Sequence, residues 1–207
     1  MIGIIDYGAG NIFSISNALK KNKIKNKIIT CEKDFDDCRK LIIPGVGAFS
    51  SAIDKLKTKN FFEIIKEHQR KGHQIVGICL GMQILFSKGN ENGIESNGLD
   101  FIKGNVKKIN PNINNEKIYR LPHIGWSKID IDDNYKNYFK NCNLNNYYFV
   151  HSYACINEDK KTEIVAKCKY GNTEFNCFVK KDNIYGMQFH PERSGASGLN
   201  LLNNLLK

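Results

Sequence analysis

Apolar and polar positions alternate in two different ways along the chain, and the change falls near residue 86. In the first half, short apolar runs alternate with segments whose apolar residues recur at helical spacing, with glycine-rich turns between them. The runs predict strands at 2–5, 27–30, 41–43 and 75–78. The helical spacing predicts helices over 12–19, 50–56 and 61–69. This alternation predicts a parallel sheet flanked by helices, with ligand sites at the carboxyl ends of its strands.

The second half carries short strand-like runs separated by turn signals. Residues 87–97 are polar and punctuated by glycine, and we expect a loop there. Antiparallel strands are expected at 105–109, 126–131, 147–150, 163–168, 175–179 and 184–189. We also expect asparagine-rich surface loops at 110–116 and 132–146 and a closing helix at 199–206. At 207 residues the chain fits a single domain, 1–207, with no evident linker or repeat.

The composition is that of a soluble globular domain, with 41% hydrophobic and 25% charged residues. The formal net charge of +10 comes almost entirely from an excess of lysine. Because the lysines are scattered and no aromatic-basic recognition motif accompanies them, we expect no nucleic acid partner. A basic surface can still steer an acidic protein or a phosphorylated substrate toward the chain.

The cysteines argue against two kinds of stabilising site. There are seven, an odd number, and no two are spaced C-x-x-C, so neither a zinc site nor a disulfide framework is indicated. The amino-terminal apolar run is broken by Asp6 too early for a signal peptide, and no run approaches membrane-spanning length. We therefore expect a reduced, cytoplasmic protein with no membrane partner.

The most informative stretch is 74–86, where an apolar run ends at Cys79 and a helical pattern begins at once. A cysteine at such a turn is held with its side chain exposed, and Gly77 and Gly81 remove side chains that would collide there. The amino terminus of the following helix favours a thiolate, and the N–H of Leu80 could donate to an oxyanion. The alternative is an ordinary buried cysteine, and this pattern alone leaves both interpretations open.

Two glycine-rich loops follow predicted strands, at 6–11 and 44–49. The first could cradle a phosphate, but the full dinucleotide-binding fingerprint is missing. In the second, Gly45 and Gly47 flank Val46 and allow a peptide to point its N–H at a substrate oxygen. A tight strand-to-helix turn is the alternative for this loop.

A cysteine nucleophile needs a base, and His190 is the favoured candidate. It follows a predicted strand, and Pro191 stiffens the next turn so that Glu192 can fold back onto the imidazole. The alternative is a surface turn with incidental charges. His151 also follows a strand and His123 lies in the segment 121–126, but neither has an adjacent acid, so we favour His190 as the base.

Several segments together resemble one enzyme family. Residues 77–83, Gly-Ile-Cys-Leu-Gly-Met-Gln, and 188–192, Gln-Phe-His-Pro-Glu, resemble the class I glutamine amidotransferases over essentially the whole chain. Within that family, the segments 6–11, 44–49, 122–126 and 148–153 are similar to the glutaminase subunits of imidazole glycerol phosphate synthase. The resemblance implies an α/β three-layer sandwich, whose mainly parallel central sheet is flanked by helices and extended by antiparallel strands from the second half.

The resemblance also implies a hydrolytic site without cofactor or metal. Cys79, His190 and Glu192 would form a triad that hydrolyses glutamine to glutamate and ammonia through a thioester. The oxyanion would meet backbone N–H groups from Leu80, Val46 and Gly47. Glutamine would be held by Gly45, Gln83, Glu91, His151, Ser152 and Tyr153.

The implied partner is a barrel-shaped cyclase subunit, which uses the ammonia to make imidazole glycerol phosphate and an aminoimidazole carboxamide ribonucleotide in histidine biosynthesis. Two positions depart from the group's pattern, because Arg193 stands where lysine is usual and Ser127 where asparagine is usual. Both bear on which partner docks. If a peptide of the 44–47 loop must reorient before it can donate, that loop would be a reasonable switch for partner-dependent activity.

Three other functions fit parts of the same sequence. The same glutaminase chemistry could supply ammonia to a sugar amidotransferase in bacterial surface-polysaccharide biosynthesis. A non-catalytic binding subunit could keep the fold, although all three triad residues are present. A stand-alone cysteine hydrolase would share Cys79, but Gln83 and the segment 151–153 favour glutamine as substrate.

Overall fold

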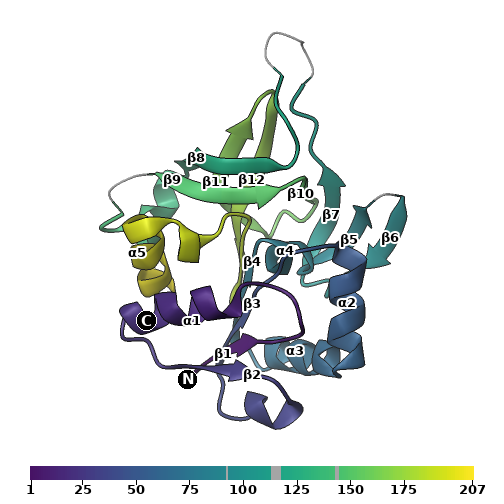
Figure 1. Cartoon of the computed structure of the whole chain (residues 1–207), viewed down its shortest axis with the longest axis vertical. Coiled ribbons are helices and arrows are strands. Elements are labelled where there is room, and N and C mark those ends of the chain that lie inside the picture. Colours follow the sequence, from purple (N-terminus) through teal and green to yellow (C-terminus); the bar gives the residue numbers. More distant parts are fainter. Residues whose placement is uncertain (92, 113–117, 143–144) are drawn as a thin grey trace.

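A central sheet joins the two halves of the chain (Figure 1). The computed structural model describes residues 1–91, 93–112, 118–142 and 145–207. Within them, nine strands form this sheet in the order β2-β1-β3-β4-β13-β12-β11-β8-β9. Neighbours from β2 to β13 pair in parallel, and those from β13 to β9 pair antiparallel. The bounds are β1 Ile2–Ile5, β2 Asn26–Ile29, β3 Lys40–Ile43, β4 Gln74–Ile78, β8 His123–Ile131, β9 Asn146–His151, β11 Glu163–Tyr170, β12 Thr173–Lys181 and β13 Ile184–Met187.

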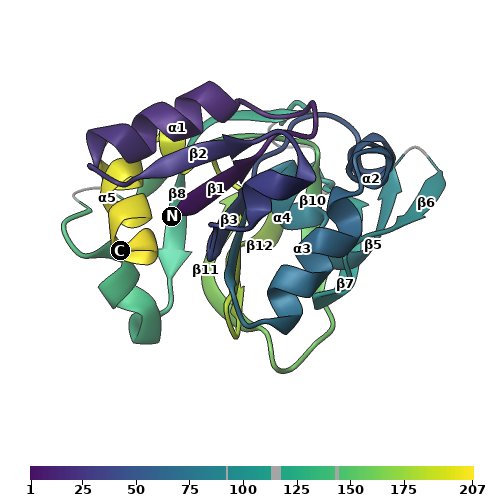
Figure 2. The same cartoon turned by 90° about the horizontal axis from the view of Figure 1, so that it is seen from below.

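Helices cover both faces of the parallel strands. The structure contains α1 Ile12–Lys21, α2 Phe49–Thr58, α3 Phe61–Arg70, α4 Leu80–Gln83 and α5 Gly195–Leu206, with 3-10 turns η1 Glu32–Phe35, η2 Asp133–Phe139 and η3 Pro191–Arg193. Figure 2 shows α1 and α5 on one side of the sheet and α2 and α3 on the other. Successive strand residues face opposite sides, so Ile4 packs in the α1 and α5 cluster and Ile5 in the α2 and α3 cluster. Each such side chain stabilises the fold by about 1.5–3 kcal/mol on burial.

A second sheet lies beside the first and corrects the loop prediction for 87–97. Among the described residues its four strands run in the order β10-β7-β5-β6, with bounds β5 Phe86–Glu91, β6 Ile94–Asn97, β7 Ile102–Lys108 and β10 Tyr153–Asn157. The 87–97 prediction is wrong because β5 and β6 form a hairpin there, with residue 92 outside the described part. The helical spacing over 80–86 also predicted too long a helix, since α4 is a single turn and Phe86 begins β5.

The sequence led us to expect only antiparallel strands in the second half, but two of its strand pairings are parallel. β13 pairs in parallel with β4 at the centre of the large sheet, and β5 pairs in parallel with β7. The other predicted strands and the closing helix are present with somewhat different ends. The loop predicted at 132–146 contains η2, and its residues 143–144 lie outside the described part. Of the loop predicted at 110–116, residues 113–116 also lie outside it.

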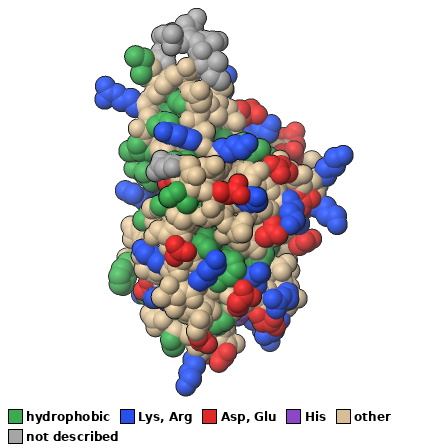
Figure 3. Space-filling view, turned by 90° about the vertical axis from the view of Figure 1, so that its right-hand side faces the viewer, with side chains coloured by type: hydrophobic (Ala, Val, Ile, Leu, Met, Phe, Trp, Pro, Cys, Tyr) green, Lys and Arg blue, Asp and Glu red, His purple; other side chains and the backbone are tan. Residues whose placement is uncertain are grey.

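The surface mixes charges of both signs. On the face shown in Figure 3, basic side chains are interspersed with acidic ones. One pair on the β5–β6 hairpin joins Lys88 Nζ to Glu95 Oε1 at 2.9 Å, and both side chains are about half exposed. Such exposed pairs add little stability. Across the described residues, no helix is both long and apolar enough to cross a membrane.

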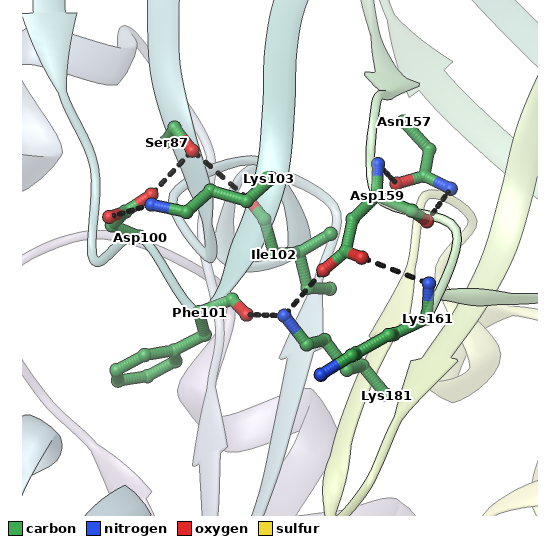
Figure 4. A network of polar contacts seen from close by, with 9 residues as sticks. All are labelled: Ser87, Asp100, Phe101, Ile102, Lys103, Asn157, Asp159, Lys161 and Lys181. Atoms are coloured by element: carbon green, nitrogen blue, oxygen red, sulfur yellow. Dashed lines mark hydrogen bonds and ion pairs between the residues drawn. The ribbon is translucent and has the colours of Figure 1, made fainter.

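A polar network connects the two sheets (Figure 4). Lys181, at the end of β12, places its Nζ 2.6 Å from Asp159 Oδ2 and donates to the carbonyl of Phe101 at 3.0 Å. The side chains of Lys181 and Asp159 are only 19% and 14% exposed. The hydrogen bond from Lys181 and one from the N–H of Lys161 lower the pKa of Asp159. Lys181 therefore links β12 to the turn before β7.

We expect Lys181→Met to lower the melting temperature at neutral pH by a few degrees, because Asp159 and the Phe101 carbonyl each lose a donor. The pKa of Asp159 is lowered in the folded state, so this contribution exists above its ordinary value of 3.8 and disappears as pH falls through the folded pKa. Calorimetry from neutral to acidic pH measures the difference from wild type. Lys160→Met, at an exposed neighbour, is the control. A loss that persists undiminished in acid would contradict the ion-pair explanation.

Candidate active site

Cys79 lies on the turn between β4 and α4 with φ 56° and ψ −112°, a backbone conformation that non-glycine residues rarely adopt. The turn needs its two glycines. A β-carbon on Gly77 would lie 2.6 Å from the carbonyl carbon of Gly81, and one on Gly81 would collide with the carbonyl of Ile43. Since α4 is one turn long, its dipole stabilises a thiolate less than the helix we expected.

His190 reaches Cys79 because β13 and β4 are adjacent. The N–H of Cys79 donates to Met187 at 2.7 Å, and the N–H of His190 donates to Tyr148 at 2.9 Å, which holds both residues at the same end of the sheet. His190 Nδ1 lies 2.8 Å from Glu192 Oε1 across the turn η3. Their side chains are 5% and 1% exposed. The structure therefore brings Cys79, His190 and Glu192 together, as the sequence led us to expect.

The charge of His190 is set by its neighbours. Burial acts to lower its pKa, but interactions with Cys79 and the Glu192 carboxylate outweigh burial and raise the pKa to about 10. His190 is thus an imidazolium at neutral pH. Because the folded pKa lies above the ordinary 6.5, its stabilising contribution is full below pH 6.5 and is lost as pH rises toward 10. Its Nε2 is buried and has no hydrogen-bond partner among the described residues, so it is free to serve a reacting group.

Gln188 contacts the thiol, and we did not single it out from the sequence. It is fully buried, and its Nε2 donates to Cys79 Sγ at 3.7 Å. Its Oε1 accepts from Gln83 Nε2 at 3.1 Å. An amide donor at this position stabilises negative charge on sulfur. The signal was present, because a glutamine two residues before His190, directly after an apolar strand, has to find a polar partner in the protein interior.

A pocket of about 230 Å³ opens beside Cys79. Its walls are formed by Val46, Gly47, Cys79, Leu80, Gln83, Glu91, Val150, His151, Ser152 and Tyr153. The set contains nearly all the predicted oxyanion and glutamine-binding residues, and the size suits a small molecule such as an amino acid. Gly45 lies behind the wall, where a β-carbon would come within 2.8 Å of Tyr7 Oη. Among the described residues, no group of three metal-ligating side chains gathers here or elsewhere.

Glu91 has a structural contact as well as a place in the pocket. Its Oε2 accepts from the N–H of Phe49 at 2.8 Å and so caps the amino terminus of α2. We expected Glu91 in a polar loop, but it ends β5. This hydrogen bond ties the hairpin to the helix that follows the 44–49 loop. Its role toward substrate stays a prediction.

The 44–49 loop is held at one end and open at the other. The buried Tyr7 donates from Oη to the Pro44 carbonyl at 2.7 Å. By contrast, Val46 is 49% exposed, and Gly47 has φ +108° with no atom within 4 Å of where a β-carbon would stand. The Val46–Gly47 peptide thus has space around it.

His151 and His123 are neutral and point into the protein. Burial lowers the pKa of His123 to about 4. Burial, partly opposed by a hydrogen bond to the Tyr153 backbone, lowers the pKa of His151 to about 3. Both ring nitrogens of His151 are engaged within the protein, at Tyr153 and His123. The geometry therefore favours His190 over His151 as the base.

Comparison with known proteins assigns this fold and site to a class. The family model "Glutamine amidotransferase class-I" matches residues 3–207. The chain belongs to the class-I glutamine amidotransferase family. Within it, the curated relatives are named "Imidazole glycerol phosphate synthase subunit HisH", so the predicted likeness to that group is confirmed. The relative from Caldanaerobacter subterraneus is 42% identical over 99% of this chain and 96% of its own length, and that from Leptospira interrogans 40% over 99% and 98%.

Solved structures agree on the fold. A crystal structure titled "glutamine amidotransferase" matches with a TM-score of 0.75 at 15% identity, covering 99% of this chain and 98% of that one. PurLQS from Thermotoga maritima matches with a TM-score of 0.70 at 18% identity, covering 99% and 96%. The predicted α/β sandwich and the predicted enzyme class are thereby confirmed. The roles of individual residues stay predictions, as does the single domain.

We expect Glu192→Gln to slow alkylation of Cys79 by iodoacetamide about tenfold between about pH 6 and 8. The glutamine can still accept from His190 Nδ1, but without the carboxylate charge the pKa of His190 falls and less imidazolium is present to stabilise the thiolate. Mass spectrometry of the Cys79 peptide gives the rate. The exposed Cys31 in the same molecule is the internal control and should react equally in both proteins. Equal rates at Cys79 would contradict this account of the site.

Proposed function

We propose that the chain is the glutaminase subunit of an imidazole glycerol phosphate synthase, which releases ammonia from glutamine for a cyclase subunit. The observation that carries the proposal is the buried His190–Glu192 pair, 2.8 Å across, beside a cysteine that lines an amino-acid-sized pocket. The relatives' printed names support the choice of synthase. The proposed location is the cytoplasm, where the thiol stays reduced.

In the proposed reaction, His190 first donates a proton and later accepts one. The Cys79 thiolate attacks the side-chain amide carbon of glutamine, and the resulting oxyanion meets the N–H of Leu80 and a peptide N–H from the Val46–Gly47 loop. His190 gives its proton to the departing nitrogen, so ammonia leaves and a thioester remains. Water then attacks the thioester, with His190 as base, and glutamate leaves. Glu192 orients and charges the imidazole throughout.

The pocket walls suit the amino-acid end of glutamine. Its ammonium group would lie near the carboxylate of Glu91 and an acceptor on Gln83, both of which line the pocket. Its carboxylate would take backbone donors from the 151–153 segment. The side-chain amide would then reach Cys79.

Large apolar side chains near the pocket support a protein partner. Val46 lines the pocket and is 49% exposed, and Trp126 is 58% exposed. Trp126 packs against Tyr148 at 6.2 Å between ring centroids, and the carbonyl of Tyr148 holds His190. Arg193 lies over the same tyrosine ring at 4.6 Å. Exposed aromatic and arginine side chains are enriched at binding surfaces, so we place the partner over this rim.

The test of this function follows glutamate release by the purified chain, with and without a cyclase subunit of imidazole glycerol phosphate synthase and its nucleotide-like ligand. We expect a large rise that depends on the cyclase and falls at least about 1,000-fold in Cys79→Ala. Stimulation instead by a sugar amidotransferase would change the partner and keep the chemistry. Glutamate release that no partner affects would favour a stand-alone hydrolase. No glutamate release under any condition would favour a non-catalytic binding subunit.

A second test concerns the loop as a switch. We expect Gly47→Ala to reduce partner-dependent stimulation about tenfold. An L-residue is strained at φ +108°, and its β-carbon restricts the conformations through which the Val46–Gly47 peptide can reorient. Gly72→Ala is a matched control, since Gly72 also has a positive φ and open space but lies in the turn before β4, at the far end of that strand. Unchanged stimulation in Gly47→Ala would rule out the loop as the switch.

A further inference from the structure

A chain of hydrogen bonds leads from β8 into the glutamine pocket. Ser127 Oγ lies 2.8 Å from His123 Nε2, and His123 Nδ1 lies 3.1 Å from His151 Nε2. His151 Nδ1 then lies 2.8 Å from the carbonyl oxygen of Tyr153, a pocket residue. The three side chains therefore form one continuous line from the strand to the pocket wall.

The final acceptor determines the proton positions along this line. A carbonyl oxygen only accepts, so His151 must carry its proton on Nδ1. Neutral His151 then accepts at Nε2, which requires a proton on His123 Nδ1. His123 accepts at Nε2 in turn, so the Ser127 hydroxyl is the donor that starts the line. Both imidazoles are thereby neutral Nδ1–H tautomers.

Packing holds the rings in this arrangement. His123 and His151 face each other as cross-strand partners on β8 and β9. The His123 ring is stacked between Phe149, at 5.0 Å and 17°, and Tyr170, at 4.0 Å and 20°. The histidines are only 2% and 6% exposed. Neither ring can turn without disturbing the aromatic core.

The line continues from Tyr153 to the nucleophile. The carbonyl of Tyr153 also accepts from Gln83 Nε2 at 3.0 Å, and the same amide nitrogen donates to Gln188 Oε1 at 3.1 Å. Gln188 Nε2 in turn donates to Cys79 Sγ. Because both acceptors take the nitrogen of Gln83, its Oε1 remains available to a ligand in the pocket. The orientation of the Tyr153 carbonyl thus influences how Gln83 meets substrate.

We propose that Ser127 and His123 are positioning residues of the glutamine site, which act through the tautomer of His151 to hold the Tyr153 carbonyl and the Gln83 amide in their binding orientation. This inference rests on the proposed glutaminase function for its substrate. Neither residue lines the pocket, and the action passes through oriented hydrogen bonds. Their loss weakens substrate binding more than the chemical step.

The test uses a matched pair, Ser127→Thr and Ser127→Val, which differ in a hydroxyl and hardly in shape. We expect the threonine protein to behave like wild type. The valine protein should have a KM for glutamine raised roughly tenfold, the factor for one hydrogen bond of typical net strength, with kcat changed less than about threefold. Glutamate release with the cyclase subunit present gives both constants. Equal KM values for threonine and valine would overturn the proposal, as would a loss confined to kcat.

A second readout does not depend on activity. Nitrogen-15 NMR of histidine-labelled protein distinguishes the two neutral imidazole tautomers. In wild type and Ser127→Thr we expect both His123 and His151 as Nδ1–H, and in Ser127→Val a mixed population at His123. An Nε2–H tautomer at His151 in wild type would overturn the proposal. If no partner elicits glutaminase activity, the proposed function fails, while the tautomers still decide whether the relay exists.

Discussion

The parallel pairing of β13 with β4 is the contact on which the rest of the site depends. It places Met187 opposite Ile78, so the residues that follow each strand leave the sheet at the same edge. Cys79 emerges from one strand and His190 from its neighbour, with Gln188 between them and against the sulfur. No side chain bridges a long distance in this arrangement. The geometry of the candidate active site follows from strand register and two short turns.

Burial acts on three histidines here with opposite outcomes. It disfavours the charged form of each, but interactions with Cys79 and with the Glu192 carboxylate outweigh burial at His190, and its pKa rises. His123 and His151 have only a hydroxyl, a carbonyl and each other, and their pKa values fall. The same sheet edge thus holds one charged imidazole beside Cys79 and two neutral ones that are hydrogen-bonded to each other. The interactions of His190 with Cys79 and with Glu192 make the difference.

Local features of the site could be predicted from the sequence, and non-local ones could not. The strand ending at Cys79 and the His190–Glu192 turn each lie within a few residues, so apolar runs, glycines and a proline were enough to predict them. The partner of β13 depends on the whole sheet, and we expected an antiparallel strand there. The β5–β6 hairpin was missed because its residues are mostly polar and leave no apolar alternation. Residues 80–86 imitated a helix because a buried turn and a buried strand start happened to share helical spacing.

The order of the sheet has a consequence for the chain during synthesis. Gln188 and Cys79 touch but are 109 positions apart, so β13 can insert between β4 and β12 only long after β4 has been made. Until then Cys79 lacks its contact with Gln188 and its neighbour His190, so the proposed nucleophile of a nascent chain is not yet activated. The same delay leaves the hydrogen-bonding edge of β4 unpaired, and an unpaired strand edge is prone to association with other chains. The pairing of β13 with β4 therefore closes the aggregation-prone edge and completes the proposed active site in one step.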